Sequence, residues 1–444
     1  MGVNLIIFVS LLLDLMAFTL ILPLLPSTLE CFAKTDMSGL YQFMQTFIDS
    51  SQSLMGLPEK FNKALFGGIL GSWFSLLQFV TMPLIGSLSD VYGRRIMYLS
   101  CLVSISLSYL LWVVSANYFS IFVLFRTFGG LSKGNISLST AIITDVSTEE
   151  KRGKGFALIG IAFSLAFILG PLLGAFMTLG HFSDWSQSCF QYLPPLVALF
   201  FSLVNLLFSY FYLPETLPTS KRSQSIGTGL KDAFNYINPS SLLSFRLIKN
   251  THYKEKRLLQ LGGWINFTFL FIYSGLEFTL TFLTYIRFNF TNIQQGKLFF
   301  YVGIVMFLIQ GLFVRRINVK NYPTILLTGI AFAIPAFFII GLSSNLSTLS
   351  FGLVLYAYSS ATVVPTLSTL VSTFGSNDQK GTVLGTFRSI GALARATGPL
   401  TASFIFWKYG IQTVYCLGGC AMFIPLYLAV KLNSSCKIHK DPID

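Results

Sequence analysis

Long apolar stretches alternate with short polar segments along the whole chain. A helix that crosses the hydrocarbon core of a bilayer needs about 20 mostly apolar residues, and twelve stretches approach this length. The first six lie at 3–26, 64–86, 96–115, 119–142, 155–177 and 191–213. The second six lie at 259–285, 298–314, 323–343, 349–371, 381–406 and 411–432. The pattern predicts an all-α membrane protein with twelve transmembrane helices in two pseudo-symmetric six-helix bundles.

The composition favours a membrane protein over a soluble one. Of the 444 residues, 53% are hydrophobic and only 11% are charged, whereas a soluble domain usually carries about 25% charged residues. A soluble globule of this size cannot bury so many apolar side chains. The composition also excludes disordered, collagen-like and disulfide-stapled secreted proteins. The net charge of +13 does not indicate nucleic-acid binding, because the basic residues lie in short segments between apolar stretches.

The basic residues also predict the orientation of the chain. If both termini are cytoplasmic, twenty Lys and Arg lie in inner segments and six lie in outer segments. Cytoplasmic loops carry an excess of Lys and Arg, so we expect both termini to be cytoplasmic. The predicted domains are an N-terminal bundle at 1–213, a cytoplasmic central loop at 214–258 and a C-terminal bundle at 259–444. The pattern does not distinguish the plasma membrane from an internal membrane.

Three features of the predicted outer side leave alternatives open. Cys31 and Cys189 both fall in outer segments, so they either form a disulfide or remain free thiols. Asn289 and Asn345 each begin a glycosylation sequon, but both lie close to the predicted bilayer. Neither modification is determined by the sequence.

The two halves of the chain match at a few positions. Gly170-Pro171 in the fifth stretch corresponds to Gly398-Pro399 in the eleventh, at an offset of 228. Asp14 in the first stretch likewise has a counterpart in Glu277 of the seventh. Two six-helix halves related by duplication are typical of secondary transporters, whose substrate site lies near the bilayer midplane.

Six ionisable residues lie inside the predicted spans. They are Asp14, Arg126, Lys133, Glu277, Arg388 and Arg395. Each costs about 2.5–3.5 kcal/mol at a helix centre, so six unpaired residues would cost about 15–20 kcal/mol. We therefore expect them to face a water-filled cavity, each other, or both. Arg126 and Lys133 are seven residues apart, and so are Arg388 and Arg395. Each of these two basic pairs therefore shares one helix face.

Four cations against two acids give this set a positive surplus. Surplus positive charge in a cavity attracts anions, and arginine can bind a carboxylate or sulfonate with two hydrogen bonds. The candidate substrate-binding residues are Arg126, Lys133, Arg388 and Arg395. Nearby aromatic side chains favour an amphipathic organic anion, and Asp14 and Glu277 are the candidate proton carriers. The alternative is that the six form internal ion pairs, such as Asp14 with Arg126, that hold helices together.

Several motifs of the first half resemble those of the major facilitator superfamily. The run Gly86-Ser-Leu-Ser-Asp90-Val-Tyr-Gly93-Arg94-Arg95 resembles its signature loop after the second helix. Leu124-Phe-Arg126-Thr-Phe-Gly-Gly130 resembles its fourth-helix arginine motif, and Gly160 through Gly170-Pro171-Leu-Leu-Gly174 resembles its fifth-helix antiporter motif. The resemblance implies a gating or structural role for the motif residues and their neighbours. These residues are Gly86, Asp90, Gly93, Arg94, Arg95, Asp145, Arg152, Gly170, Pro171 and Gly174.

The charged part of this loop has two interpretations. The resemblance implies that Asp90 caps the cytoplasmic end of the eleventh helix, and Arg94 and Arg95 can pair with Asp145 or Glu149 on the same inner face. The alternative is that both arginines only anchor the topology by binding anionic lipid.

A narrower resemblance concerns the drug:proton antiporters related to bacterial tetracycline exporters. Asp14 with Ile21-Leu-Pro-Leu-Leu-Pro26 resembles their first helix. The runs at 130–140 and 388–399 are similar to the animal tetracycline-transporter-like members of the superfamily. The resemblance implies an organic anion antiporter or exporter with broad, drug-like substrates, and hence multidrug efflux.

No phosphate-cradling motif and no His/Cys/Asp cluster indicates an enzyme, and we expect no cofactor and no metal. The leading interpretation is a secondary-active transporter that works by alternating access around a cationic midplane site. The alternatives are a transporter-fold sensor or scaffold without transport, and an anion channel or lipid scramblase. The expected partners are small organic anions, protons or a counter-anion, and membrane lipids, but no nucleic acid. We expect a monomer.

Overall fold

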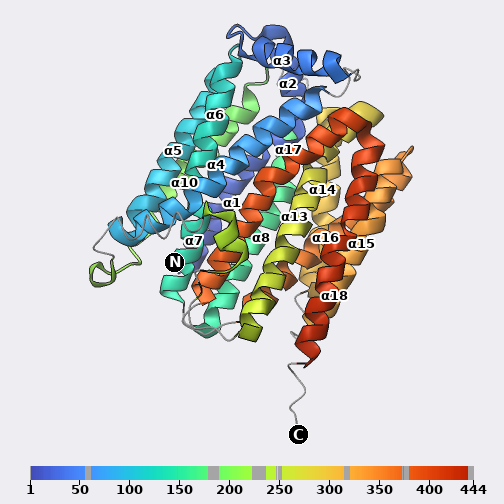
Figure 1. Ribbon diagram of the computed structural model, residues 1–444. Helices are drawn as coiled ribbons and strands as arrows, with labels where there is room; N and C mark the ends of the chain where they lie inside the picture. Colours follow the sequence, from blue (N-terminus) through green and yellow to red (C-terminus); the bar gives the residue numbers. More distant parts are fainter. Residues whose placement is uncertain are drawn as a thin grey trace. The chain divides into compact units, whose positions relative to one another are not determined.

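A computed structural model describes residues 2–55, 62–147, 149–178, 190–222, 237–246, 248, 253–314, 321–372, 374 and 380–438. All regular elements among these residues are helices (Figure 1). The first half contains α1 (Val3–Thr19), α2 (Leu25–Thr35), α3 (Leu40–Met55), α4 (Asn62–Tyr92), α5 (Arg94–Val114), α6 (Phe119–Ser132), α7 (Asn135–Val146), α8 (Glu149–Phe176) and α10 (Leu193–Tyr212). The rest contains α12 (Pro239–Leu243), α13 (Tyr253–Phe288), α14 (Asn292–Leu308), α15 (Tyr322–Leu342), α16 (Leu346–Ser372), α17 (Lys380–Ala421) and α18 (Phe423–Ile438).

Each of the twelve predicted spans corresponds to helical structure, but several of the helices are divided differently from the prediction. Among the described residues, ten helices are long and apolar enough to cross a membrane. The predicted span 119–142 is absent from these ten because it is broken into α6 and α7. The predicted spans 381–406 and 411–432 are merged into one, Gly385–Ser435. Gly410 marks the bend between them with a φ of 84°, a value that glycine adopts without a steric cost.

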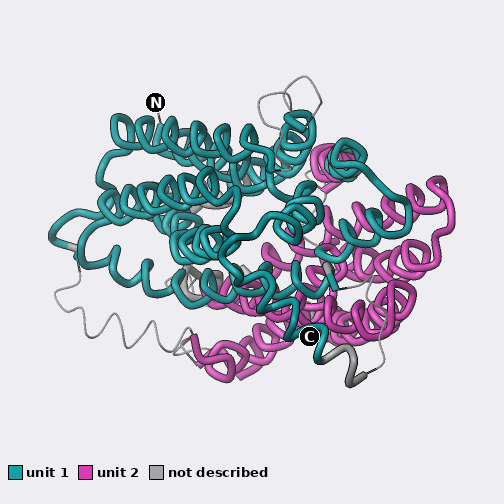
Figure 2. Tube along the Cα trace, turned by 90° about the horizontal axis from the view of Figure 1, so that it is seen from above, with its two compact units in different colours: residues 1–234, 278–303 teal, residues 235–277, 304–444 magenta. Residues whose placement is uncertain are grey.

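By contacts between residues the chain divides into two compact units, shown in two colours in Figure 2. Unit 1 contains 1–234 and 278–303, and unit 2 contains 235–277 and 304–444. The division into 1–213, 214–258 and 259–444 comes from the sequence repeat and stays a prediction. Residues 223–236 of the predicted central loop lie outside the described residues.

Residues 278–303 belong to unit 1 because aromatic and small side chains of this segment pack on α4 and α8. The ring of Phe282 lies against Gly67, and the ring of Phe278 lies against Gly71, so a Cβ at either glycine would overlap the ring. Gly296 of α14 lies against Ala175 of α8 in the same way. Small residues permit two helices to approach closely where their contacting faces are apolar.

Both Gly-Pro motifs pack against the helix that carries the embedded acid of the same unit. In unit 1, Gly170 lies against Thr19 and Gly174 lies against the backbone of Leu20, both at the end of α1. In unit 2, Gly398 lies against the carbonyl oxygen of Phe271 on α13. A side chain at these glycines would push the two helices apart, which gives the matched motifs of the two halves a common packing role.

The segment between α2 and α3 is fixed to the start of α6 through Asp36. Its carboxylate accepts hydrogen bonds from the backbone N–H of Phe119 at 2.9 Å, of Ser38 at 2.9 Å and of Tyr41 at 3.0 Å. Burial alone would raise the pKa of Asp36, but these hydrogen bonds and one from the Ser38 hydroxyl outweigh it, so the pKa is lowered. Cys31 of α2 is disulfide-bonded. Cys189, its suggested partner, lies outside the described residues.

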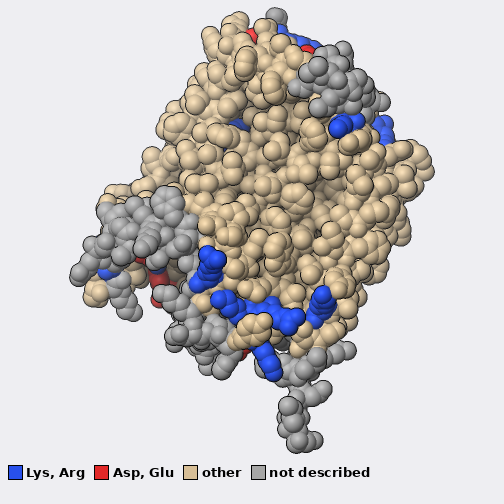
Figure 3. All heavy atoms as spheres, viewed as in Figure 1, with Lys and Arg blue, Asp and Glu red and all other residues tan. Residues whose placement is uncertain are grey.

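Large apolar side chains are exposed along the spans, as a lipid-facing surface requires. Phe211 of α10 is 74% exposed and Leu207 is 57% exposed. On the face shown in Figure 3, uncharged side chains cover a wide area, and Lys and Arg gather mainly toward its edges. Wide exposed apolar surfaces are rare on soluble monomers and mark a membrane or partner surface.

Candidate functional site

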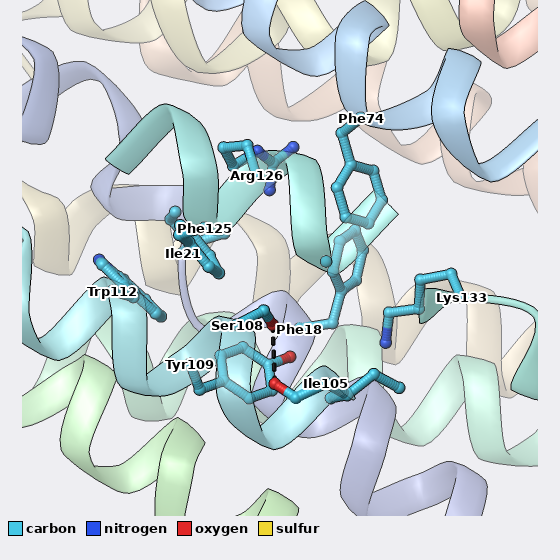
Figure 4. A pocket seen from close by; sticks show the side chains of 11 residues that line it. Phe18, Ile21, Phe74, Ile105, Ser108, Tyr109, Trp112, Phe125, Arg126 and Lys133 are labelled. Atoms are coloured by element: carbon cyan, nitrogen blue, oxygen red, sulfur yellow. Dashed lines mark hydrogen bonds between the residues drawn. The ribbon is translucent and has the colours of Figure 1, made fainter. Parts of the chain in front are cut away.

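A small cavity lies inside unit 1, among side chains of α1, α4, α5 and α6. Its volume is about 10 Å³, roughly the space that one water molecule needs. It is lined by Phe18, Ile21, Phe74, Ile105, Ser108, Tyr109, Trp112, Phe125, Arg126, Gly129 and Lys133 (Figure 4). The cavity is therefore lined by aromatic side chains and by two of the cations that the sequence predicted, Arg126 and Lys133.

Two stacked phenylalanine rings separate these cations. The Arg126 Cζ atom lies 4.3 Å from the centroid of the Phe74 ring, and Lys133 Nζ lies 5.1 Å from that of Phe18. The two rings stack with their centroids 5.3 Å apart. Figure 4 shows them between Arg126 and Lys133. Each ring face attracts its cation, which stabilises a positive charge where water is scarce.

Lys133 is paired with Asp14. The Lys133 Nζ donates hydrogen bonds to Asp14 Oδ1 at 2.7 Å and to Oδ2 at 2.8 Å, and Asn135 Nδ2 donates to Oδ2 at 2.8 Å. All three side chains are buried, at 3%, 1% and 0% exposure for Lys133, Asp14 and Asn135. Burial of an ion pair is tolerated when further hydrogen bonds satisfy its partners, and Asn135 supplies one here.

A break in the fourth span positions both partners of Asp14. The helix α6 ends at Ser132, Lys133 leaves helical geometry with φ −72° and ψ 16°, and α7 begins at Asn135. Gly134 between them lies against Ile85 of α4, where a Cβ would overlap the isoleucine side chain. Non-helical backbone at membrane depth is tolerated only inside the protein or along a cavity, and broken helices commonly carry transport sites.

Arg126 has no acidic partner among the described residues. It is 8% exposed, and its buried Nε atom makes no hydrogen bond there. Besides Phe74, the guanidinium lies 5.9 Å from the centroid of Phe125, whose ring stacks on Trp112. An unpaired buried cation costs several kcal/mol, so this arrangement suits an anionic ligand that would pair with it. The charges at this cavity sum to one positive charge, since Asp14 neutralises Lys133.

Unit 2 has its own charged cluster on α13, α16 and α17. The Glu277 carboxylate interacts electrostatically with Arg395 and accepts a hydrogen bond from the Tyr356 hydroxyl. Arg388 and Arg395 are both exposed on α17, and their spacing of seven residues puts them on the same side of that helix. The two embedded acids therefore pair with cations from helices that are not equivalent in the repeat, α6 in unit 1 and α17 in unit 2.

The signature loop forms an ion-pair network within unit 1. Arg94 Nη1 lies 2.6 Å from Asp90 Oδ1, and its Nε lies 3.0 Å from Asp145 Oδ2. Glu215 accepts hydrogen bonds from the backbone N–H groups of Arg94 and Arg95 at 3.0 and 3.3 Å. The contact between Arg94 and Asp145 that the sequence suggested is thus present.

Two glycines of this loop differ in what they require. Gly93 has a φ of 102°, which favours glycine, and a Cβ there would overlap the Glu215 carboxylate. Gly86, by contrast, has only the Ser137 hydroxyl within 4.0 Å. The side chains of Arg152 and Glu149 lie outside the described part of the chain, and the role of Asp90 at the eleventh helix stays a prediction.

Comparison with known proteins identifies the family. A sequence profile described as "Major Facilitator Superfamily" matches residues 7–399. The chain belongs to the Major Facilitator Superfamily. It is therefore a multi-pass membrane transporter with the major facilitator fold, and not an enzyme.

Relatives of this transporter include a human protein named "Major facilitator superfamily domain-containing protein 10". The two are 43% identical over 434 residues, which cover 96% of this chain and 92% of the relative. A solved structure entitled "Crystal structure of the human organic anion transporter MFSD10 (TETRAN)" matches with a TM-score of 0.81 and 42% identity, over 96% of this chain and 98% of that chain. The "Tetracycline resistance protein, class B" of Escherichia coli is 24% identical over 400 residues, which cover 89% of this chain and 86% of the relative.

Sequence reasoning about this transporter missed three parts of the site. Asn135 was not identified as a partner of Asp14, and Tyr356 was not identified as a partner of Glu277. The Phe18 and Phe74 rings were not assigned to Lys133 and Arg126. The position of Asn135, directly after the embedded Lys133 and Gly134, was a signal in the sequence that could have identified it as a partner of Asp14.

Proposed function

We propose that this transporter carries amphipathic organic anions by alternating access around a cationic midplane site. The relative of solved structure is titled an organic anion transporter, and the charge pattern of this chain independently favours the same substrate sign. Arg126 of unit 1 and Arg388 and Arg395 of unit 2 are the proposed anion contacts. Both termini are proposed to be cytoplasmic.

Arg126 is the observation that carries this proposal. It is a buried guanidinium without an acidic partner among the described residues, and it lies against the Phe74 and Phe125 rings. A carboxylate or sulfonate would pair with the guanidinium, and the apolar part of the same molecule would contact the rings. The cavity is too small for such a molecule in this conformation, so substrate entry requires its side chains to move.

The test is uptake of labelled naphthalenesulfonate into proteoliposomes that contain the full-length protein. We expect saturable uptake that is accelerated by unlabelled sulfonate inside the vesicles. Arg126→Gln should raise the KM about tenfold or more, because a hydrogen bond to a charged group contributes about 1.5–3 kcal/mol. Arg246→Gln removes the same charge from an exposed position and should leave the KM unchanged.

The other outcomes separate the alternative functions. Absence of saturable uptake by the wild type would contradict the proposal and favour a sensor or scaffold. Conductance or lipid flipping without counterflow would favour a channel or scramblase. Equal KM values for the wild type and Arg126→Gln would remove Arg126 from the site.

A further inference from the structure

We propose that Lys133 is a second anion-binding charge that ionised Asp14 neutralises and protonated Asp14 releases. A proton on Asp14 and an anion in the cavity would then favour each other's binding. This inference rests on the proposed function, since it concerns how the anion site is regulated. It predicts that the proton and the organic anion move together in the same direction.

The first argument is the position of Lys133. Its side chain lines the cavity that Arg126 also lines, yet two of its three N–H donors are directed at the two oxygens of Asp14. The ammonium also lies over the Phe18 ring, which faces the same cavity. Lys133 therefore lies where it can bind an anion in the cavity, but its charge is neutralised while Asp14 is ionised.

The second argument is what a proton on Asp14 would change. The carboxyl group would lose its charge and one acceptor position, and Asn135 would retain an acceptor on the other oxygen. The charge of the cavity would rise from one to two, because Lys133 would no longer be neutralised. Conversely, an anion that paired with the Lys133 ammonium would leave the buried Asp14 without a cation. A buried carboxylate without a cation favours its protonated form.

The other groups around Asp14 do not replace it as the proton carrier. The groups that interact with it electrostatically from α5 are Tyr98, Cys101 and Tyr109. Ordinary pKa values of about 10 for tyrosine and 8.5 for cysteine keep these neutral near pH 7. Lys133 and Arg126 from α6 are the cations at the cavity, and Asn135 from α7 does not titrate. The described residues of α8 and α10 that pack on α1 add no acid beside Asp14.

The sign of this coupling is fixed by thermodynamic reciprocity. If a proton improves anion binding, an anion improves proton binding by the same factor. Transport of one anion with one proton would then be electroneutral. The drug:proton exchange implied by the sequence resemblance needs the opposite sign, because there the proton and the cargo compete.

Binding of labelled naphthalenesulfonate to the purified full-length protein tests this sign. A sulfonate stays charged throughout the working pH range, so any pH dependence belongs to the protein. We expect the Kd of the wild type to fall as the pH is lowered, by at most about tenfold per pH unit for one proton. Asp14→Asn should bind tightly at every pH, and Lys133→Gln should bind weakly at every pH. The control Asp49→Asn removes an exposed acid and should keep the wild-type pH dependence.

A second measurement needs no variant. Addition of naphthalenesulfonate to weakly buffered wild-type protein should cause proton uptake, which a pH-indicator dye records. In proteoliposomes, an acidic outside should drive accumulation of the anion inside. Proton release, accumulation driven by an acidic inside, or a Kd that does not depend on pH would overturn the inference while leaving organic anion transport intact. Failure of the wild type to bind or transport the sulfonate would instead overturn the proposed function and this inference with it.

Discussion

Lys133 and Asp14 are 119 positions apart in the sequence, and the ammonium of one donates to both carboxylate oxygens of the other at 2.7 and 2.8 Å. Each charge would be costly alone at membrane depth, and each removes most of the cost of the other. The pair also leaves Arg126 as the uncompensated cation of the cavity in the described part of unit 1. Arg126 is therefore the proposed anion contact, and Asp14 and Lys133 form the proposed proton-sensitive pair.

Removal of one partner of this pair should cost more stability than removal of both. Asp14→Ala leaves Lys133 buried without an acid, and breaking a buried pair in this way typically costs about 3–5 kcal/mol. The double variant Asp14→Ala/Lys133→Ala leaves no charge uncompensated, so we expect it to have a higher Tm in detergent than Asp14→Ala alone. Additive losses in this double-mutant cycle would show that the two side chains do not interact.

The contact between α1 and α8 should be sensitive to one glycine and insensitive to another in the same helix. A Cβ at Gly174 would overlap the Leu20 carbonyl oxygen, whereas a Cβ at Gly160 would have no atom within 4 Å. We expect Gly174→Ala to destabilise the protein by about 1–3 kcal/mol and Gly160→Ala to have little effect. Thermal unfolding of both variants in detergent measures the difference. Equal Tm values would show that the helices are not in close contact at Gly174.

The segment between α2 and α3 should lose stability in acid through Asp36. Because the pKa of Asp36 in the folded protein is below its ordinary value of 3.8, its ionised form stabilises the fold at pH values above about 4. That contribution is lost as the pH falls through the lowered pKa. Asp36→Asn keeps an acceptor but lacks the charge, so its Tm should be lower than that of the wild type near neutral pH.

The same Tm difference should shrink as the pH falls below about 4, since the wild-type carboxyl group then becomes neutral as well. The control Asp49→Asn, on the exposed side of α3, should show no such trend. A gap between wild type and Asp36→Asn that grows in acid would contradict a lowered pKa.

Arg395 should affect transport more than a lysine of the same helix does. Arg395 is exposed on α17 and interacts with Glu277, so Arg395→Glu both removes a proposed anion contact and places two acids near each other. We expect saturable naphthalenesulfonate uptake to fall about tenfold or more. Lys408→Gln also removes a positive charge from α17, but its ammonium contacts Tyr409 instead. Unchanged uptake by Arg395→Glu would exclude Arg395 from the substrate site.

The sequence by itself determined the fold class of this protein. Hydrophobic stretches of membrane-spanning length are a local property, and a bilayer accepts a helix wherever such a stretch occurs. The embedded charges could also be found without a structure, because a charge inside an apolar stretch is conspicuous. The helical spacing of Arg388 and Arg395 predicts that both lie on one side of α17, and both are exposed there.

Only the tertiary structure decided which charge meets which. The sequence allowed Asp14 to pair with Arg126, whereas the fold pairs it with Lys133, and the reason is the break between α6 and α7. Glycine packing against Ile85 and the non-helical backbone at Lys133 set that break, and neither follows from hydrophobic periodicity. The stacking of Phe18 on Phe74 likewise joins residues of α1 and α4. Such contacts between distant segments depend on how helices pack, and a one-dimensional pattern does not encode that arrangement directly.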